Sequence, residues 1–279
     1  VVQDLGAIGK IREVHSWIDA AGHGRSGLLE PPADPKPTPP GVDWDRWIGP
    51  APMREYGGDF VYHPRWWRDW QDFGTGSIGD NGCHLLDPVF TALDLTEPLS
   101  VHCDHSGMND QIYPASETIT WVFPGTAYTA GDTLEVKWYD GGRRPRWKHP
   151  GLPSGDSLPQ PASMLIGEKG YLLIMHWGEP KLYPERDFAD FAWPQLEPAH
   201  HYHDWVDACL SGDRALSDDF EYAGRLTETV QLGNVAARFR RQTLQWDAAN
   251  LRITNVEEAN GFLTRSYRPG WEVEPRGQE

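Results

Sequence analysis

The chain has 279 residues and a formal net charge of −16, from 25 Lys and Arg against 41 Asp and Glu. This acidic balance argues against nucleic acid or an anionic membrane as a partner, because both require a basic face. Three cysteines are too few for a disulfide scaffold, and no apolar run is long enough to span a bilayer. With 39% hydrophobic residues, the composition is that of a folded chain with a sizeable core.

Two features stand out before any motif is considered. The sequence starts at Val1 with no initiator Met and no signal-like segment, so we expect it to begin inside a structural element. It also holds 14 Trp, five of them between Trp44 and Trp70. Aromatic clusters are usually core, but in a stretch rich in Pro and Gly they can also wall a pocket for a sugar-like ligand.

The first third of the chain predicts few regular elements. Alternating β-formers predict a strand over residues 10–18, and an apolar stripe predicts a long helix over residues 77–93. Between them lies a long irregular excursion, residues 19–42, followed by a short helix at 43–48 that Asp43 caps. Residues 1–5 resemble the last turn of a helix that ends at Gly6.

After residue 93, apolar residues recur at every second position, as in strands. Further along the chain they recur with the spacing of a helix. Strands are predicted at residues 99–103, 117–123, 133–139, 164–166, 171–176 and 181–183, with turns at 140–142 and 167–170. Helices follow at 201–210 and 219–240, then short extended pieces at 244–246 and 251–254, a last helix at 257–263 and an arm at 265–273. This order predicts an α+β fold, with an antiparallel sheet and helices on one side.

Residues 74–79 read G-T-G-S-I-G, which has the spacing of a dinucleotide-binding loop. That loop must follow a buried strand, so that its glycines lie at the strand–helix turn. The preceding residues, 66–73, carry three charges and no run of Val or Ile. We therefore interpret this motif as an entry into the long helix and not as a nucleotide site.

Three polar residues of the long helix are spaced to share one face: Asp80, His84 and Asp87. A carboxylate beside an imidazole fixes its tautomer and raises its basicity, as a general base acting on a hydroxyl requires. A surface pair that only supports the helix is an equally good interpretation. The histidines at 200, 201 and 203 could ligate a metal, but a polar first helical turn is the better interpretation.

Several segments, in order along the chain, resemble the Gfo/Idh/MocA oxidoreductases. They read WIGPAP at 47–52, YHP at 62–64, DFGTG at 72–76 and GD-x-x-CH-x-x-D at 79–87, followed by the closing segments LGNVA, LQWD, ITN and R-x-YR-x-GW between residues 232 and 271. The resemblance runs from about Gly6 to Trp271. The subgroup common in planctomycetes and Bacteroidetes is the most similar.

The resemblance implies a two-domain enzyme. An N-terminal Rossmann domain binds NAD or NADP, and a C-terminal domain with an open, mostly antiparallel sheet, like that of glyceraldehyde-3-phosphate dehydrogenase, binds substrate and oligomerises. Residues 1–9 would be the junction and residues 10–279 the C-terminal domain. The family's Glu-Lys-Pro motif is absent here, so we expect the Rossmann half to lie upstream of Val1 and the isolated chain to be inactive. Any export signal would also precede Val1.

For the site, the resemblance implies His84 as the proton-transfer residue and Asp80 as its partner or as a ligand of a substrate hydroxyl. Asp87 and, by their position near the motif, Tyr62, His63, Trp67 and Arg68 are candidates for substrate binding. The expected substrate is a sugar, polyol or related carbohydrate, which exchanges a hydride with the nicotinamide. The expected assembly is a homo-oligomer formed through the sheet.

No cofactor-binding or metal-ligating residue is expected within the chain itself. Two other classes remain open from the residues alone. One is a non-catalytic carbohydrate-binding or oligomerisation module, and the other is a metal-dependent hydrolase or isomerase built on Asp80, His84 and the later histidines.

Overall fold

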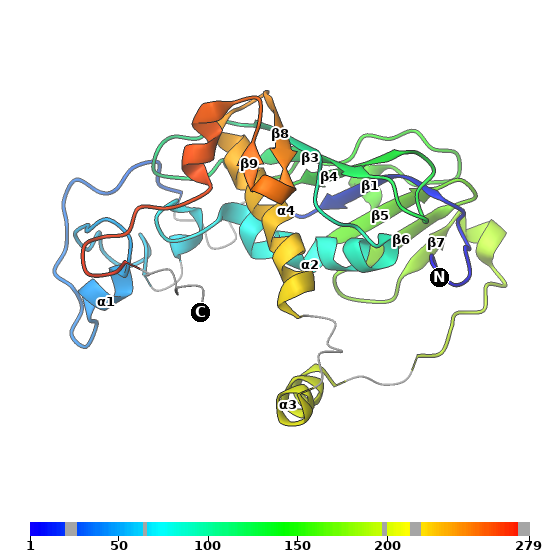
Figure 1. Ribbon diagram of the computed structural model, residues 1–279, viewed down its shortest axis with the longest axis horizontal. Coiled ribbons are helices and arrows are strands. Elements are labelled where there is room, and N and C mark those ends of the chain that lie inside the picture. Colours follow the sequence, from blue (N-terminus) through cyan, green and yellow to red (C-terminus); the bar gives the residue numbers. More distant parts are fainter. Residues whose placement is uncertain (20–26, 64–65, 197–199, 213–218, 273–279) are drawn as a thin grey trace.

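In a computed structural model, the structure describes residues 1–19, 27–63, 66–196, 200–212 and 219–272. Some predicted segments lie partly outside the described residues. They are residues 20–26 of the irregular excursion, Pro64 of the YHP segment and Val273 of the C-terminal arm. Within the described residues, nine strands form one sheet in the order β7-β6-β5-β1-β4-β3-β2-β8-β9 (Figure 1). All neighbouring strands are antiparallel except β1 and β4, so the predicted fold class is confirmed.

The strands follow the predicted segments closely. They are β1 Ile11–Trp17, β2 Ser100–His105, β3 Glu117–Pro124, β4 Thr133–Tyr139, β5 Ala162–Gly167, β6 Tyr171–Met175, β7 Lys181–Tyr183, β8 Thr243–Asp247 and β9 Arg252–Ile253. In β3 buried and half-buried residues alternate along the strand, as the period of two requires. The turn between β5 and β6 closes with the Gly167 N–H donating to the Gly170 carbonyl, at 2.9 Å.

The helices also match, with one difference in type. They are α1 Trp44–Ile48, α2 Gly76–Leu93, α3 His201–Ser211 and α4 Phe220–Arg238, and the short 3₁₀ helices are η1 Trp66–Asp69, η2 Gly155–Ser157, η3 Glu185–Phe188, η4 Ala248–Asn250 and η5 Glu257–Phe262. Asp43 caps α1 by accepting from the Arg46 N–H, as predicted. The predicted last helix is η5, a 3₁₀ helix. None of the helices in the described residues is long and apolar enough to cross a membrane.

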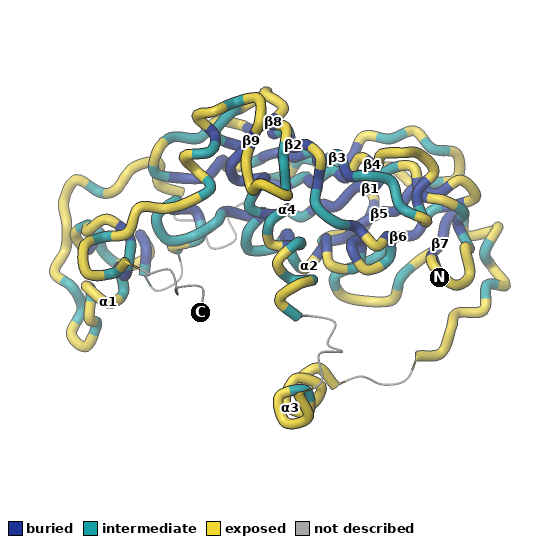
Figure 2. The backbone as a smooth tube through the Cα atoms, in the orientation of Figure 1, coloured by how far each residue is buried: buried dark blue, intermediate teal, exposed yellow. Residues whose placement is uncertain are grey.

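The main core lies between one face of the sheet and the two long helices, α2 and α4 (Figures 1 and 2). Trp121, on β3, is fully buried there, and its indole N–H donates to the Thr229 carbonyl of α4 at 2.9 Å. Gly233 lets α4 approach closely, since a Cβ there would lie 2.9 Å from the Ile119 side chain. Val2 and Ile8 pack into this same core.

A second, smaller core lies on the other face of the sheet. The loop between β4 and β5 folds over Trp17 and covers it with Trp147, Leu152 and Leu158. Beside this cover, Glu13 lies between two imidazoles: His149 Nε2 is 2.8 Å from Oε1 and His15 Nε2 is 3.4 Å from Oε2.

This network predicts an acid-sensitive contribution to stability. The hydrogen bond and charge of His15, together with His149, lower the pKa of Glu13 from 4.5 to about 2. A carboxyl with a depressed folded pKa stabilises the fold above its unfolded pKa, and this stabilisation is lost as pH falls from 4.5 towards 2. Glu13→Gln should therefore destabilise the protein at neutral pH and cost progressively less over that interval, as urea unfolding would measure. An equal cost at neutral pH and near pH 2 would contradict this.

Candidate functional site

Helix α2 presents the polar face that the sequence predicted. Its apolar stripe, which includes Leu85, Leu86 and Val89, packs on the sheet. The Ser163 hydroxyl of β5 donates to the Leu85 carbonyl at 2.7 Å and joins this part of the helix to the sheet. On the other side His84 is exposed and Asp80 is half-buried. The helix is therefore anchored by one face while its polar face stays free to meet a ligand.

Asp80 is paired with an arginine. Arg68 Nε, from η1, lies 2.7 Å from Asp80 Oδ2, and both side chains are about three-quarters buried, with 25% and 30% exposed. The Arg68 guanidinium also lies 5.3 Å from the ring of Trp67, which is 36% exposed. Within the described residues no hydrogen bond joins Asp80 to His84. The predicted Asp–His pair is thus not formed, and Asp80 instead holds Arg68 beside the polar face of α2.

His84 has a neighbour that the sequence reasoning missed. The ring of His176, which directly follows β6, lies 5.2 Å from the ring of His84, and Trp177 stacks edge-on against His176 at 4.3 Å. Burial lowers the pKa of His176, and the charge of His84 lowers it further, so the neutral imidazole is favoured there. Trp177 is 74% exposed. In the sequence, His176 and Trp177 stand only at the end of a predicted strand. No motif spacing connects them with residue 84, so this contact could not be predicted.

Asp87 has a structural partner. The Tyr222 hydroxyl, from α4, donates to Asp87 Oδ1 at 2.6 Å and lies 3.0 Å from Thr91 Oγ1. Burial, together with this hydrogen bond to Asp87, raises the pKa of Tyr222. This contact joins the two long helices, and it accounts for Asp87 without a substrate.

Tyr222→Phe should therefore lower stability without affecting chemistry. We expect a loss of about 1 kcal/mol in urea unfolding, the usual net value of one hydrogen bond, because Asp87 stays partly solvated. Tyr267→Phe is the matched control, since Tyr267 is 41% exposed and should change nothing. Equal stabilities of the two variants would contradict the structural role of Asp87.

The tryptophan-rich segment forms a small core of its own. Tyr62 is only 1% exposed and is surrounded by the rings of Trp44, Trp47, Trp70 and Phe73. This geometry argues against the predicted substrate contact for Tyr62, because its side chain is closed off by aromatic neighbours. His63 is half-buried against the edge of Trp47, with ring centroids 6.0 Å apart.

The glycines of residues 74–79 have packing roles. They follow the 3₁₀ helix η1 instead of a strand. A Cβ on Gly74 would lie 2.3 Å from the Arg68 carbonyl oxygen, and Gly76, with φ +67°, faces the ring of Tyr113. A dinucleotide does not fit this turn, because the glycines are packed against the chain itself.

At the start of α3, the rings of His200 and His203 stack with centroids 3.9 Å apart. Among the described residues there is no group of three or more His, Cys, Asp or Glu side chains that could hold a metal ion.

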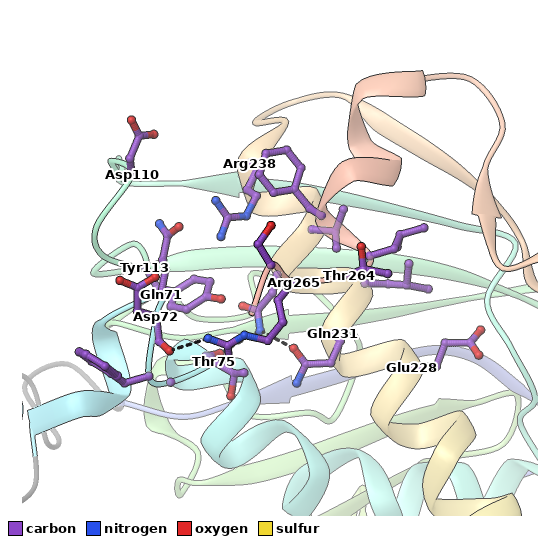
Figure 3. A pocket seen from close by; sticks show the side chains of 18 of the residues that line it. Gln71, Asp72, Thr75, Asp110, Tyr113, Glu228, Gln231, Arg238, Thr264 and Arg265 are labelled. Atoms are coloured by element: carbon purple, nitrogen blue, oxygen red, sulfur yellow. Dashed lines mark hydrogen bonds between the residues drawn. The ribbon is translucent and has the colours of Figure 1, made fainter. Parts of the chain in front are cut away.

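A cavity of about 970 Å³ lies beside the loop that precedes α2, and Phe73, Gly74 and Tyr113 contribute to its lining (Figure 3). It separates α4 from the loop before α2, and the chain after η5 forms one of its walls. Arg265 crosses it and donates from Nη2 to the Asp72 carbonyl at 3.2 Å. None of the candidate site residues predicted from the sequence lines this cavity, so its size alone does not make it the functional site.

Comparison with known proteins assigns a class to the region that contains α2. Residues 27–128 match the family model described as the C-terminal alpha/beta domain of an oxidoreductase family. This region, which contains Asp80 and His84, matches the C-terminal domain of the Gfo/Idh/MocA oxidoreductases. No curated protein matches the chain.

Solved structures similar to this chain include an oxidoreductase from Thermotoga maritima (11% identity, TM-score 0.45) and an NAD-binding protein from Listeria innocua (15%, 0.44). A third is the WlbA dehydrogenase from Bordetella pertussis in complex with NADH and UDP-GlcNAcA (15%, 0.46). The matches cover 86%, 86% and 88% of this chain, respectively. The chain spans 55%, 56% and 58% of the lengths of these three proteins.

Proposed function

We propose that this chain is the substrate-binding part of an NAD(P)-dependent oxidoreductase that acts on a sugar, polyol or related carbohydrate. The observation that carries the proposal is the exposed polar face of α2, with His84 beside His176, inside the segment that matches the oxidoreductase domain. In this proposal a separate domain holds the nicotinamide, because the glycine turn at 74–79 does not fit it. The bound nicotinamide supplies hydride acceptance and donation.

The chain's own residues would handle the substrate's hydroxyl groups. His84 takes the proton of the reacting hydroxyl, which an exposed imidazole on an anchored helix can reach. The ion-paired Arg68 and Asp80 supply a donor and an acceptor at a fixed position, as neighbouring hydroxyls of a carbohydrate require. The exposed rings of Trp67 and Trp177 offer apolar faces against which a sugar ring can pack.

We further propose that copies of the chain associate through the sheet face opposite α2 and α4. The helices cover one face, whereas the other carries half-buried polar side chains on its central strands, among them His102, Thr120 and Lys137. Such a face suits a polar interface between copies.

Calorimetry can test this function in a protein that joins the chain to a nicotinamide-binding domain. A polyol should bind more tightly in the presence of NAD(H), and Arg68→Met should abolish most of this binding. Arg46→Met, which removes an exposed arginine from α1, is the control. Polyol binding that ignores both the cofactor and Arg68 would instead support a carbohydrate-binding module.

A further inference from the structure

A separate pocket of about 520 Å³ lies where β3 begins and β4 ends, beyond the central Thr120–Lys137 pair of the proposed contact between copies. Three arginines line it, Arg143, Arg144 and Arg146, together with one carboxylate, Asp156. The remaining lining residues are uncharged: Thr118, Tyr139 and Gly142. In a chain with a net charge of −16, three guanidinium groups against one carboxylate form a local excess of positive charge.

One of these arginines is held in place by the protein. Arg143 donates from Nε to Ser116 Oγ at 3.2 Å, and from Nη1 to the Asp104 carbonyl at 3.1 Å and to Thr118 Oγ1 at 3.4 Å. Its Nη2 makes no hydrogen bond within the described part of the chain. The Thr118 hydroxyl accepts from Arg143 and so keeps its own proton available for a ligand. This corner of the pocket is preorganised, and Arg143 Nη2 and the Thr118 hydroxyl can both donate to a ligand.

The second arginine has unused donor capacity. Arg144 is half-buried, and its Nη1 is fully buried without a hydrogen-bond partner among the described residues. Burial lowers the pKa of Arg144, while Asp19 and Asp156 oppose this shift through their charges. Neither carboxylate lies within ion-pair distance of Arg144 in the described structure. A buried guanidinium donor without a partner is costly, and an anion is the group that would satisfy it.

We propose that this pocket binds the phosphate group of a small phosphorylated molecule. Guanidinium groups match phosphate oxygens with paired, charge-assisted hydrogen bonds. Arg143 is shared with Asp104, whose Oδ2 lies 4.0 Å from its Nη1, so Arg144 and Arg146, set against Asp156, supply the positive charge that a phosphate would balance. The site is separate from the α2 site, because helix α2 packs on the other face of the sheet.

Titration calorimetry of the whole chain with inorganic phosphate, at constant ionic strength, tests this site. Arg144→Met and Arg146→Met should each weaken phosphate binding about tenfold or more, as expected for the loss of hydrogen bonds to a charged group. Arg146 is exposed, so its variant tests the site even if Arg144→Met fails to fold. Arg46→Met removes one exposed arginine from α1, which contributes no residue to this pocket, and should leave binding unchanged.

Three results would overturn the proposal. The first is no measurable phosphate binding by the parent chain. The second is an equal loss in Arg46→Met, which would show that only net charge matters. The third is acetate binding as tight as phosphate, which would remove the preference for a dianion.

Discussion

Replacing His84 by alanine should lower kcat about 10²- to 10⁴-fold in a protein that joins this chain to a nicotinamide-binding domain, because the proposed function makes His84 a general base. The residue is exposed on a helix whose opposite face is anchored in the core, so the loss should come from chemistry and not from unfolding.

His201→Ala is the matched control for this measurement. It removes an exposed histidine from α3, which contains no buried residue, and should leave turnover unchanged. Steady-state kinetics and thermal unfolding should be measured on the same preparations. Wild-type turnover in His84→Ala would remove the role that we give to this residue, and the site would then have to be sought elsewhere on α2.

Trp121→Ala should cost about 3–5 kcal/mol of unfolding free energy, the usual range for the loss of a buried aromatic side chain. Trp121 is fully buried between β3 and α4, and the substitution also removes the hydrogen bond from its indole to the Thr229 carbonyl. The cavity would open under the helix that packs beside α2, so the polar face of α2 should lose its support as well.

Urea unfolding provides this free energy, and Trp177→Ala is the control. Trp177 is 74% exposed, and its removal should cost well under about 1 kcal/mol, as for most surface changes. Equal costs for the two tryptophans would mean that the interface of α4 with the sheet is not the main core.

Local patterns were sufficient to predict the elements themselves. The period of two located β3 and β4, and the apolar stripe located α2, because these patterns depend on neighbours along the chain. The parallel pairing of β1 with β4 could not be predicted in this way. Its partners, such as Val14 and Val136, lie far apart in sequence, and their pairing is decided by how the whole sheet packs.

In the candidate site, too, local patterns predicted the element, whereas the contacts between elements could not be predicted. Helical spacing correctly placed Asp80, His84 and Asp87 on one face of a helix. It could not show that Asp80 would pair with Arg68, that Asp87 would bond to Tyr222, or that His176 would meet His84. Each of these partners comes from another element, and tertiary packing alone brings it within reach. Position in a loop also did not reveal that Tyr62 is buried in an aromatic cluster.

The most direct test of the proposed function is to follow one hydrogen atom. A polyol deuterated at its carbinol carbon is given, with oxidised nicotinamide cofactor, to a protein that joins this chain to a nicotinamide-binding domain. Mass spectrometry of the reduced cofactor should find the deuterium on the nicotinamide ring, and the signal should fall with His84→Ala but not with His201→Ala. Product formed without cofactor, or reduced cofactor without deuterium, would contradict the account.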